Sequence, residues 1–123
     1  FLASLPDALA LDVEGVKIFM VHASPPDQTM GGIRLLDETG QLITEAKQTW
    51  SERLANFEYD VLIVGHTHQI INEVLGTTRV INPGSTLFNH ACGILSLPEK
   101  HFASFGLSGR DPVYFWRWGQ QEY

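Results

Sequence analysis

The chain has 123 residues, of which 44% are hydrophobic and 18% are charged, as in a single globular domain with its own core. Fourteen acidic residues against eight Lys and Arg give a net charge of −6, and no basic run argues for a nucleic-acid partner. Apolar runs such as Val61–Val64 are far shorter than the roughly 20 residues that span a bilayer, so we expect no membrane segment.

Two further features concern the compartment and the start of the chain. The single cysteine, Cys92, excludes an internal disulfide and favours a reducing compartment, so we expect a cytoplasmic protein. Residue 1 is Phe, and strand-like sequence begins almost at once without a signal-like stretch. We therefore expect that a part of the protein upstream of Phe1 is missing from this chain.

The first third of the sequence predicts a β-hairpin followed by an irregular segment. Leu9–Val13 and Val16–Val21 are short strand-like runs joined by an acidic–glycine pair that is typical of tight turns. The second run is rich in β-branched and aromatic residues, and it ends at His22. Proline and glycine residues then predict an irregular conformation over Pro25–Gly40.

The middle of the chain predicts one helix and then a buried strand. Apolar residues recur every three or four positions between Leu42 and Phe57, so we expect one amphipathic helix with Trp50 and Leu54 buried. Val61–Val64 is wholly apolar, which is typical of a strand buried on both faces. A helix that leads into such a strand is half of a layered α/β unit.

More strand-like runs follow: Ile70–Leu75, Thr78–Ile81, Ile94–Leu97, His101–Leu107 and Val113–Trp118. The first two flank a Gly-Thr pair and predict a second hairpin. The expected fold class is therefore α/β, strand-rich, with one main helix and about six strands.

Three histidines, His22, His66 and His68, follow shortly after predicted buried strands. In open α/β sheets the carboxyl ends of the strands carry the ligand-binding loops. Neutral imidazole binds Zn, Mn, Fe and Ni, and a glycine before His66 lets the backbone turn so that the two nearby rings face different neighbours. These histidines are therefore candidate metal ligands; a hydrogen-bonded surface role is the alternative for each.

Three motifs together resemble the C-terminal half of a calcineurin-like metallophosphoesterase of the small bacterial and archaeal phosphodiesterase type. They are Val21-His22-Ala23-Ser24-Pro25, Gly65-His66-Thr67-His68 and Asn82-Pro83-Gly84-Ser85, in the family's order. The resemblance implies that residues 1–123 are the C-terminal portion of one metallophosphoesterase domain. The complete fold would be a four-layer αββα sandwich, of which this chain supplies the second sheet and its helix.

The resemblance also implies a centre with two divalent metal ions, manganese first, with Fe, Ni or Zn as alternatives. His22 and His66 would bind the second ion, and His68 would bind the first. The ions would share a hydroxide that attacks a phosphodiester or a small phosphomonoester. The Asn-Pro-Gly-Ser segment would form a turn under or beside the metals.

The family's Asp-x-His, Gly-Asp and Gly-Asn-His segments are absent from this sequence. We therefore expect the catalytic residues and the remaining metal ligands upstream of Phe1, and an incomplete enzyme in this chain alone. It would need the missing N-terminal half or a partner chain, without which we expect an exposed apolar edge at Val61–Val64 and its neighbours. Arg34, in a glycine-rich loop, is a candidate for binding the phosphate of a small-molecule substrate.

A non-catalytic protein-binding scaffold of the same fold is the alternative, as in the retromer subunit that resembles these phosphatases. A scaffold would show a degraded metal site. In this sequence His22, His66 and His68 are all intact, which favours the enzyme.

Overall fold

The computed structural model describes residues 1–25 and 31–115. The described elements are a 3₁₀ turn η1 (Leu2–Ser4), the helix α1 (Thr44–Arg53) and the strands β1 (Ala8–Val13), β2 (Val16–Val21), β3 (Val61–Ile63), β4 (Ile70–Leu75), β5 (Thr78–Pro83), β6 (Ala91–Ser96) and β7 (His101–Gly106). The predicted α/β class and both predicted hairpins are confirmed. Among the described residues, neither η1 nor α1 is long and apolar enough to cross a membrane.

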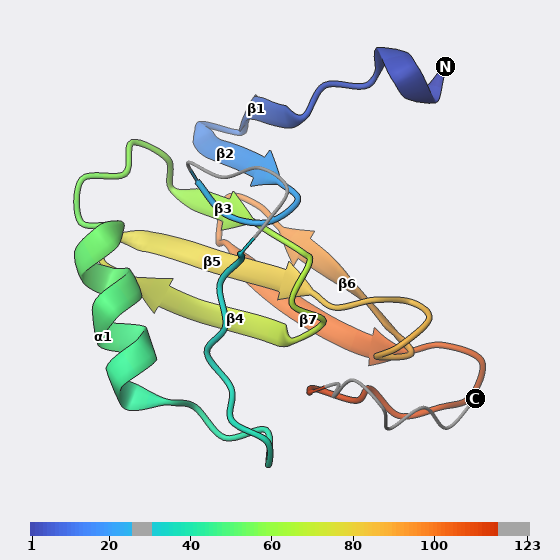
Figure 1. Cartoon of the computed structure of the whole chain (residues 1–123). Helices are drawn as coiled ribbons and strands as arrows, with labels where there is room; N and C mark the ends of the chain where they lie inside the picture. The colour runs from blue at the N-terminus through green and yellow to red at the C-terminus, as the bar shows by residue number, and fades with distance from the viewer. Residues whose placement is uncertain (26–30, 116–123) are drawn as a thin grey trace.

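Five strands form one sheet in the order β1-β2-β3-β5-β4, and β6 and β7 form a separate two-stranded sheet. The central strands β2, β3 and β5 are parallel, whereas β1 and β4 pair antiparallel at the two edges (Figure 1). Because the central strands are parallel, their carboxyl ends meet along one side of the sheet. This side is the carboxyl edge, which runs across the strands and is distinct from the edge strands β1 and β4. His22, the turn that contains His66 and the Asn-Pro-Gly-Ser segment all lie at this edge.

The two faces of the five-stranded sheet pack against different elements (Figure 1). Leu62 belongs to the cluster beneath α1. On the opposite face Ile18 and Val61 pack with Leu95 and Phe102 of the β6–β7 region. Neighbouring residues of one strand thus face opposite layers, as strand geometry requires. The described residues thus form one α-helix, a five-stranded sheet and a two-stranded sheet.

Helix α1 is shorter and less buried than the periodicity predicts. It ends at Arg53, so Phe57 lies beyond it in the connection to β3. Leu54, directly after the helix, is only 3% exposed, as expected. The prediction that Trp50 is buried is wrong, because this ring is half-buried at the margin of the core. The guanidinium of Arg53 lies 4.9 Å from the centroid of the Trp50 ring and shields part of it from water.

The strand that the sequence predicts to be buried on both faces is the central strand β3. Val61 and Leu62 are 0% exposed, because β2 and β5 flank this strand and both faces of the sheet are covered there. The prediction that this strand exposes an apolar edge is therefore wrong. The exposed apolar strand is β1, in which Leu9, Leu11 and Val13 are 41%, 38% and 40% exposed.

The C-terminal strands differ in extent from their predictions. β6 begins at Ala91, before the predicted Ile94, and β7 covers most of its predicted range. The predicted strand Val113–Trp118 runs into residues 116–123, which lie outside the described residues. Its first part forms only an isolated bridge between Phe115 and Gln69. Residues 113–115 therefore lie beside the start of β4 without forming a named strand.

We expect Leu54→Ala to lower the free energy of unfolding by about 3 kcal/mol, because it removes buried methyl groups and leaves a cavity beneath α1. Leu87→Ala is the matched control. Leu87 is 57% exposed, so its truncation should change the free energy by less than about 0.5 kcal/mol. Urea denaturation followed by tryptophan fluorescence measures both values. Equal losses for the two variants would contradict the packing described for Leu54.

Candidate metal centre

Two of the predicted metal ligands lie side by side at the carboxyl edge of the sheet. His22 directly follows β2, and His66 lies in the turn after β3. The backbone N–H of Gly65 donates to the carbonyl oxygen of His22 at 2.8 Å, which joins the two loops. Nε2 of His22 lies 3.2 Å from Nδ1 of His66, and the ring planes meet at 76°.

This separation fits two ligands of one metal ion. Metal–nitrogen bonds of about 2.0–2.1 Å at tetrahedral or octahedral angles place two ligand nitrogens about 3 Å apart. Without an ion, either Nε2 of His22 or Nδ1 of His66 carries a hydrogen and donates a hydrogen bond to the other nitrogen. Within residues 1–25 and 31–115, no group of three His, Cys, Asp or Glu side chains is arranged to hold an ion. A complete coordination shell therefore requires further ligands from outside the described residues.

His68 has different surroundings from the His22–His66 pair. Its ring stacks on Phe88, with ring centroids 4.7 Å apart and 27° between the planes. Partial burial lowers the pKa of His68, and positive charge on the neighbouring His66, His22 and Arg34 lowers it further. The neutral imidazole, which is the form that binds a metal ion, is therefore favoured.

The backbone at these two histidines adopts a conformation that is uncommon for residues with a side chain. The angle φ is 64° at His66 and 52° at His68, both in the left-handed region. Each such residue costs about 1–2 kcal/mol. The turn explains why the two rings have different neighbours, because in an extended strand side chains at i and i+2 share one face.

The Asn-Pro-Gly-Ser segment holds this turn through Asn82. This asparagine is fully buried, and its Nδ2 donates to the carbonyl oxygen of Gly65 at 3.0 Å and to Oγ1 of Thr67 at 3.1 Å. Its Oδ1 accepts from the N–H of Gly84 at 2.9 Å. One amide therefore connects the two motifs, and the Asn-Pro-Gly-Ser segment lies against the Gly-His-Thr-His turn.

Asn89 is a supporting residue that the sequence does not single out. Its Nδ2 donates to the carbonyl oxygens of His68 at 2.8 Å and Val113 at 2.6 Å, and its Oδ1 accepts from the N–H of Ser85 at 2.7 Å. Gly84 leaves room for this side chain, since φ is 77° there and an added Cβ would lie 2.9 Å from Asn89. A single asparagine carries no pattern, so only the fold shows that it is buried and fully bonded.

Gln69 is the second supporting residue that sequence reasoning missed. It is fully buried, and its Oε1 accepts from the N–H groups of Leu35 at 2.9 Å and Leu36 at 3.1 Å. Its Nε2 donates to the carbonyl oxygen of Leu36 at 3.0 Å. The side chain thus ties the histidine turn to the segment that contains Arg34.

The other histidines in the described residues lie away from this centre. Nε2 of His90 lies 2.9 Å from Nη1 of Arg110, and His101 is exposed at the start of β7. Of the predicted site residues, the structure brings His22 and His66 into contact, and it places His66, His22 and Arg34 near enough to His68 to lower its pKa.

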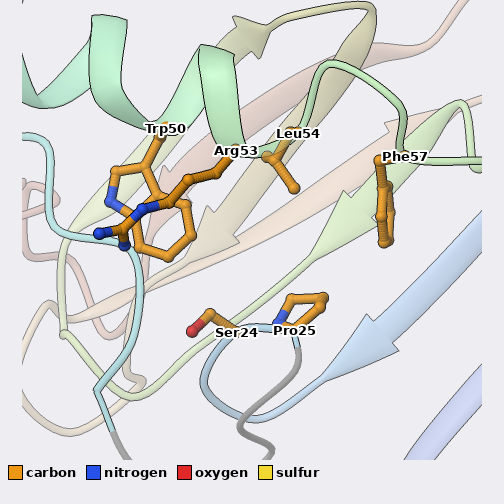
Figure 2. A pocket seen from close by; sticks show the side chains of 6 residues that line it. All are labelled: Ser24, Pro25, Trp50, Arg53, Leu54 and Phe57. Carbon is orange, nitrogen blue, oxygen red and sulfur yellow. The ribbon is translucent and has the colours of Figure 1, made fainter.

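A pocket of about 550 Å³ lies between α1 and the segment that follows β2. It is lined by Ser24, Pro25, Trp50, Arg53, Leu54 and Phe57. Figure 2 shows Arg53 lying across Trp50, with Ser24 and Pro25 on the opposite side of the pocket. Because Ser24 follows His22 by two residues, one wall of the pocket begins close to the histidine pair.

Comparison with known proteins identifies the family of the chain. The calcineurin-like phosphoesterase superfamily domain matches residues 1–93, so the chain belongs to the calcineurin-like phosphoesterase superfamily. No curated protein matches the chain.

Two solved structures share the fold. The hypothetical protein PH1004 from Pyrococcus horikoshii OT3 aligns with a TM-score of 0.66 and 21% identity, over 86% of this chain and 42% of that one. An archaeal phosphodiesterase aligns with a TM-score of 0.52 and 21% identity, over 82% of this chain and 51% of that one. The chain therefore spans about half the length of these structures.

We expect Asn89→Ala to lower the free energy of unfolding by roughly 2–4 kcal/mol, because the backbone groups of His68, Val113 and Ser85 lose a buried partner. Asn72→Ala is the matched control. Asn72 is exposed and accepts one hydrogen bond, from Arg79, so its loss should cost less than about 1 kcal/mol. Chemical denaturation of both variants is the measurement. If Asn89→Ala is as mild as Asn72→Ala, the supporting role of Asn89 is wrong.

Proposed function

We propose that the complete protein is a metal-dependent phosphoesterase that hydrolyses phosphodiesters or small phosphomonoesters. The observation that carries this proposal is the 3.2 Å separation between Nε2 of His22 and Nδ1 of His66, which suits a shared ion. Membership of the calcineurin-like phosphoesterase superfamily supports the reaction class. The fold shared with an archaeal phosphodiesterase supports it further.

Two divalent ions are proposed for this centre, with manganese as the first choice. His22 and His66 would hold one ion, and His68 would help to hold the other. When bound, such ions polarise the phosphate and lower the pKa of a bound water toward neutrality. The contribution of this chain is to hold three imidazoles in fixed, separate positions. Neutral imidazoles do not offset the charge of two divalent ions, so carboxylate ligands are expected from the rest of the protein.

The rest of the centre is proposed to come from an N-terminal half of the domain or from a partner chain. The chain spans 42% and 51% of the two similar structures, which leaves room for such a half. Strand β1 supports this proposal, because it has only one neighbour among the described strands and exposes Leu9, Leu11 and Val13. Apolar edge strands of this kind are normally covered by further structure.

A cytoplasmic location is part of the same proposal. Cys92 is a free thiol and the chain has no second cysteine with which to pair. Unpaired cysteines are typical of reducing compartments.

The activity is tested with bis(p-nitrophenyl) phosphate and Mn²⁺, comparing the 123-residue chain with a protein extended upstream. We expect turnover only by the extended protein. His66→Gln in that protein should lower kcat/KM at least about a hundredfold, since metal ligands matter more than the residues that support them. His101→Gln, at an exposed position on β7, is the matched control and should keep wild-type activity.

Two results would contradict the proposal. Turnover by the 123-residue chain alone would indicate a self-sufficient site. It would contradict the proposed need for an N-terminal half or a partner chain. No turnover by the extended protein, with all three histidines intact, would favour the scaffold alternative.

The assignment of ligands to ions gives a separate prediction. In the extended protein, His22→Ala and His66→Ala should empty the same metal site, because their ring nitrogens are in contact. His68→Ala should empty the other site, because its ring stacks on Phe88 instead. Anomalous diffraction from crystals of the three variants distinguishes the sites. Loss of the same ion in the His66 and His68 variants would refute the assignment.

A further inference from the structure

The segment Gly32–Leu36 runs alongside residues 65–69, the histidine turn. Successive residues of the segment contact successive residues of the turn. Gly32, with φ at 99°, is so close that an added Cβ would lie 2.9 Å from Cγ2 of Thr67 and 3.4 Å from Cδ2 of His66. Oγ1 of Thr67 donates to the carbonyl oxygen of Ile33 at 3.1 Å. Two residues later, Gln69 bonds the N–H groups that follow Arg34. This order places Arg34 beside His68.

Arg34 is an exposed residue between two buried neighbours. Its neighbours Ile33 and Leu35 are both fully buried, whereas Arg34 is exposed, so its side chain points away from the core. Hydrogen bonds from Thr67 to Ile33, and from Leu35 and Leu36 to Gln69, lie on either side of Arg34. They fix the Cα of Arg34 relative to the histidines.

The charge of Arg34 has no protein counterion in the described residues. The one ion pair found there joins Lys47 and Glu73. Asp37, the acidic residue nearest to Arg34 in the sequence, is engaged elsewhere. Its Oδ1 accepts from the N–H and Oγ1 of Thr39 and from the N–H of Gln41. A guanidinium near these imidazoles therefore adds positive charge to a region where no ion pair between described residues is found.

We propose that Arg34 is a phosphate-binding residue of this centre, holding the phosphoryl oxygens of the substrate beside His68. The proposal rests on the proposed phosphoesterase function. Guanidinium groups bind phosphate through two parallel, charge-assisted N–H···O bonds, and this geometry is not available to lysine. An anion at this position would also offset the positive charge that Arg34 brings to the histidines.

The test measures the binding of inorganic phosphate to the complete, Mn²⁺-loaded protein by isothermal titration calorimetry. Arg34→Gln should weaken phosphate binding about tenfold or more, the effect expected for losing a hydrogen bond between charged groups. Arg34→Lys should fall between Arg34→Gln and the wild type. Arg79→Gln is the matched control, because Arg79 lies near the opposite end of β5 and bonds Asn72. Metal content, measured by elemental analysis, should be unchanged in all three variants.

Each outcome separates the two proposals. Unchanged phosphate affinity in Arg34→Gln, or no phosphate binding by the wild type, would overturn the assignment of Arg34. Phosphate binding that depends on Arg34, in a protein that hydrolyses no ester, would support the assignment and overturn the proposed hydrolase activity.

Discussion

The hydrogen bonds that buried amide side chains make with the Gly-His-Thr-His turn are the constraint on which this site depends. His66 and His68 both lie in the left-handed region, at a cost of about 1–2 kcal/mol each. Asn82 and Asn89 are both buried, and each donates a hydrogen bond to the backbone of this turn, at the carbonyl oxygens of Gly65 and His68. The strained conformation persists because relaxing it would break these buried hydrogen bonds.

The sequence predicts the sheet well because strand burial leaves a direct pattern in it. The wholly apolar run at Val61–Val64 predicts the central strand, and both hairpins follow from short loops between β-type runs. The location of His22, His66 and His68 was also predictable, because each follows shortly after a buried strand whose carboxyl end reaches the same edge. Periodicity was less reliable for α1, since it cannot show that Trp50 lies at the margin of the core.

The sequence could not predict which polar residues support the site. Asn89 and Gln69 are ordinary in sequence, and their burial results from contacts between segments that lie far apart along the chain. The exposure of β1 was missed for a related reason. Leu9–Val13 is as apolar as a buried strand, and only the strand order shows that it lies at the edge, with β2 as its one neighbour. The hydrophobic pattern of a sequence indicates whether a residue suits a buried or an exposed position. The order of the strands decides which residues it contacts.

Hydrogen bonds from the histidine turn also link the two sides of the proposed centre, which are the histidines and Arg34. Gln69 directly follows His68 and bonds the backbone just after Arg34, while Thr67 bonds the backbone just before it. A displacement of the histidine turn would therefore move Arg34 with it. Phosphoryl transfer depends mainly on positioning and on charge that is already in place, so a metal side and a phosphate side built as one rigid unit suit it better than two independent loops. Gln69 and Thr67 therefore hold the histidine turn and the Arg34 segment in one arrangement, as the proposed binding of one phosphate by both requires.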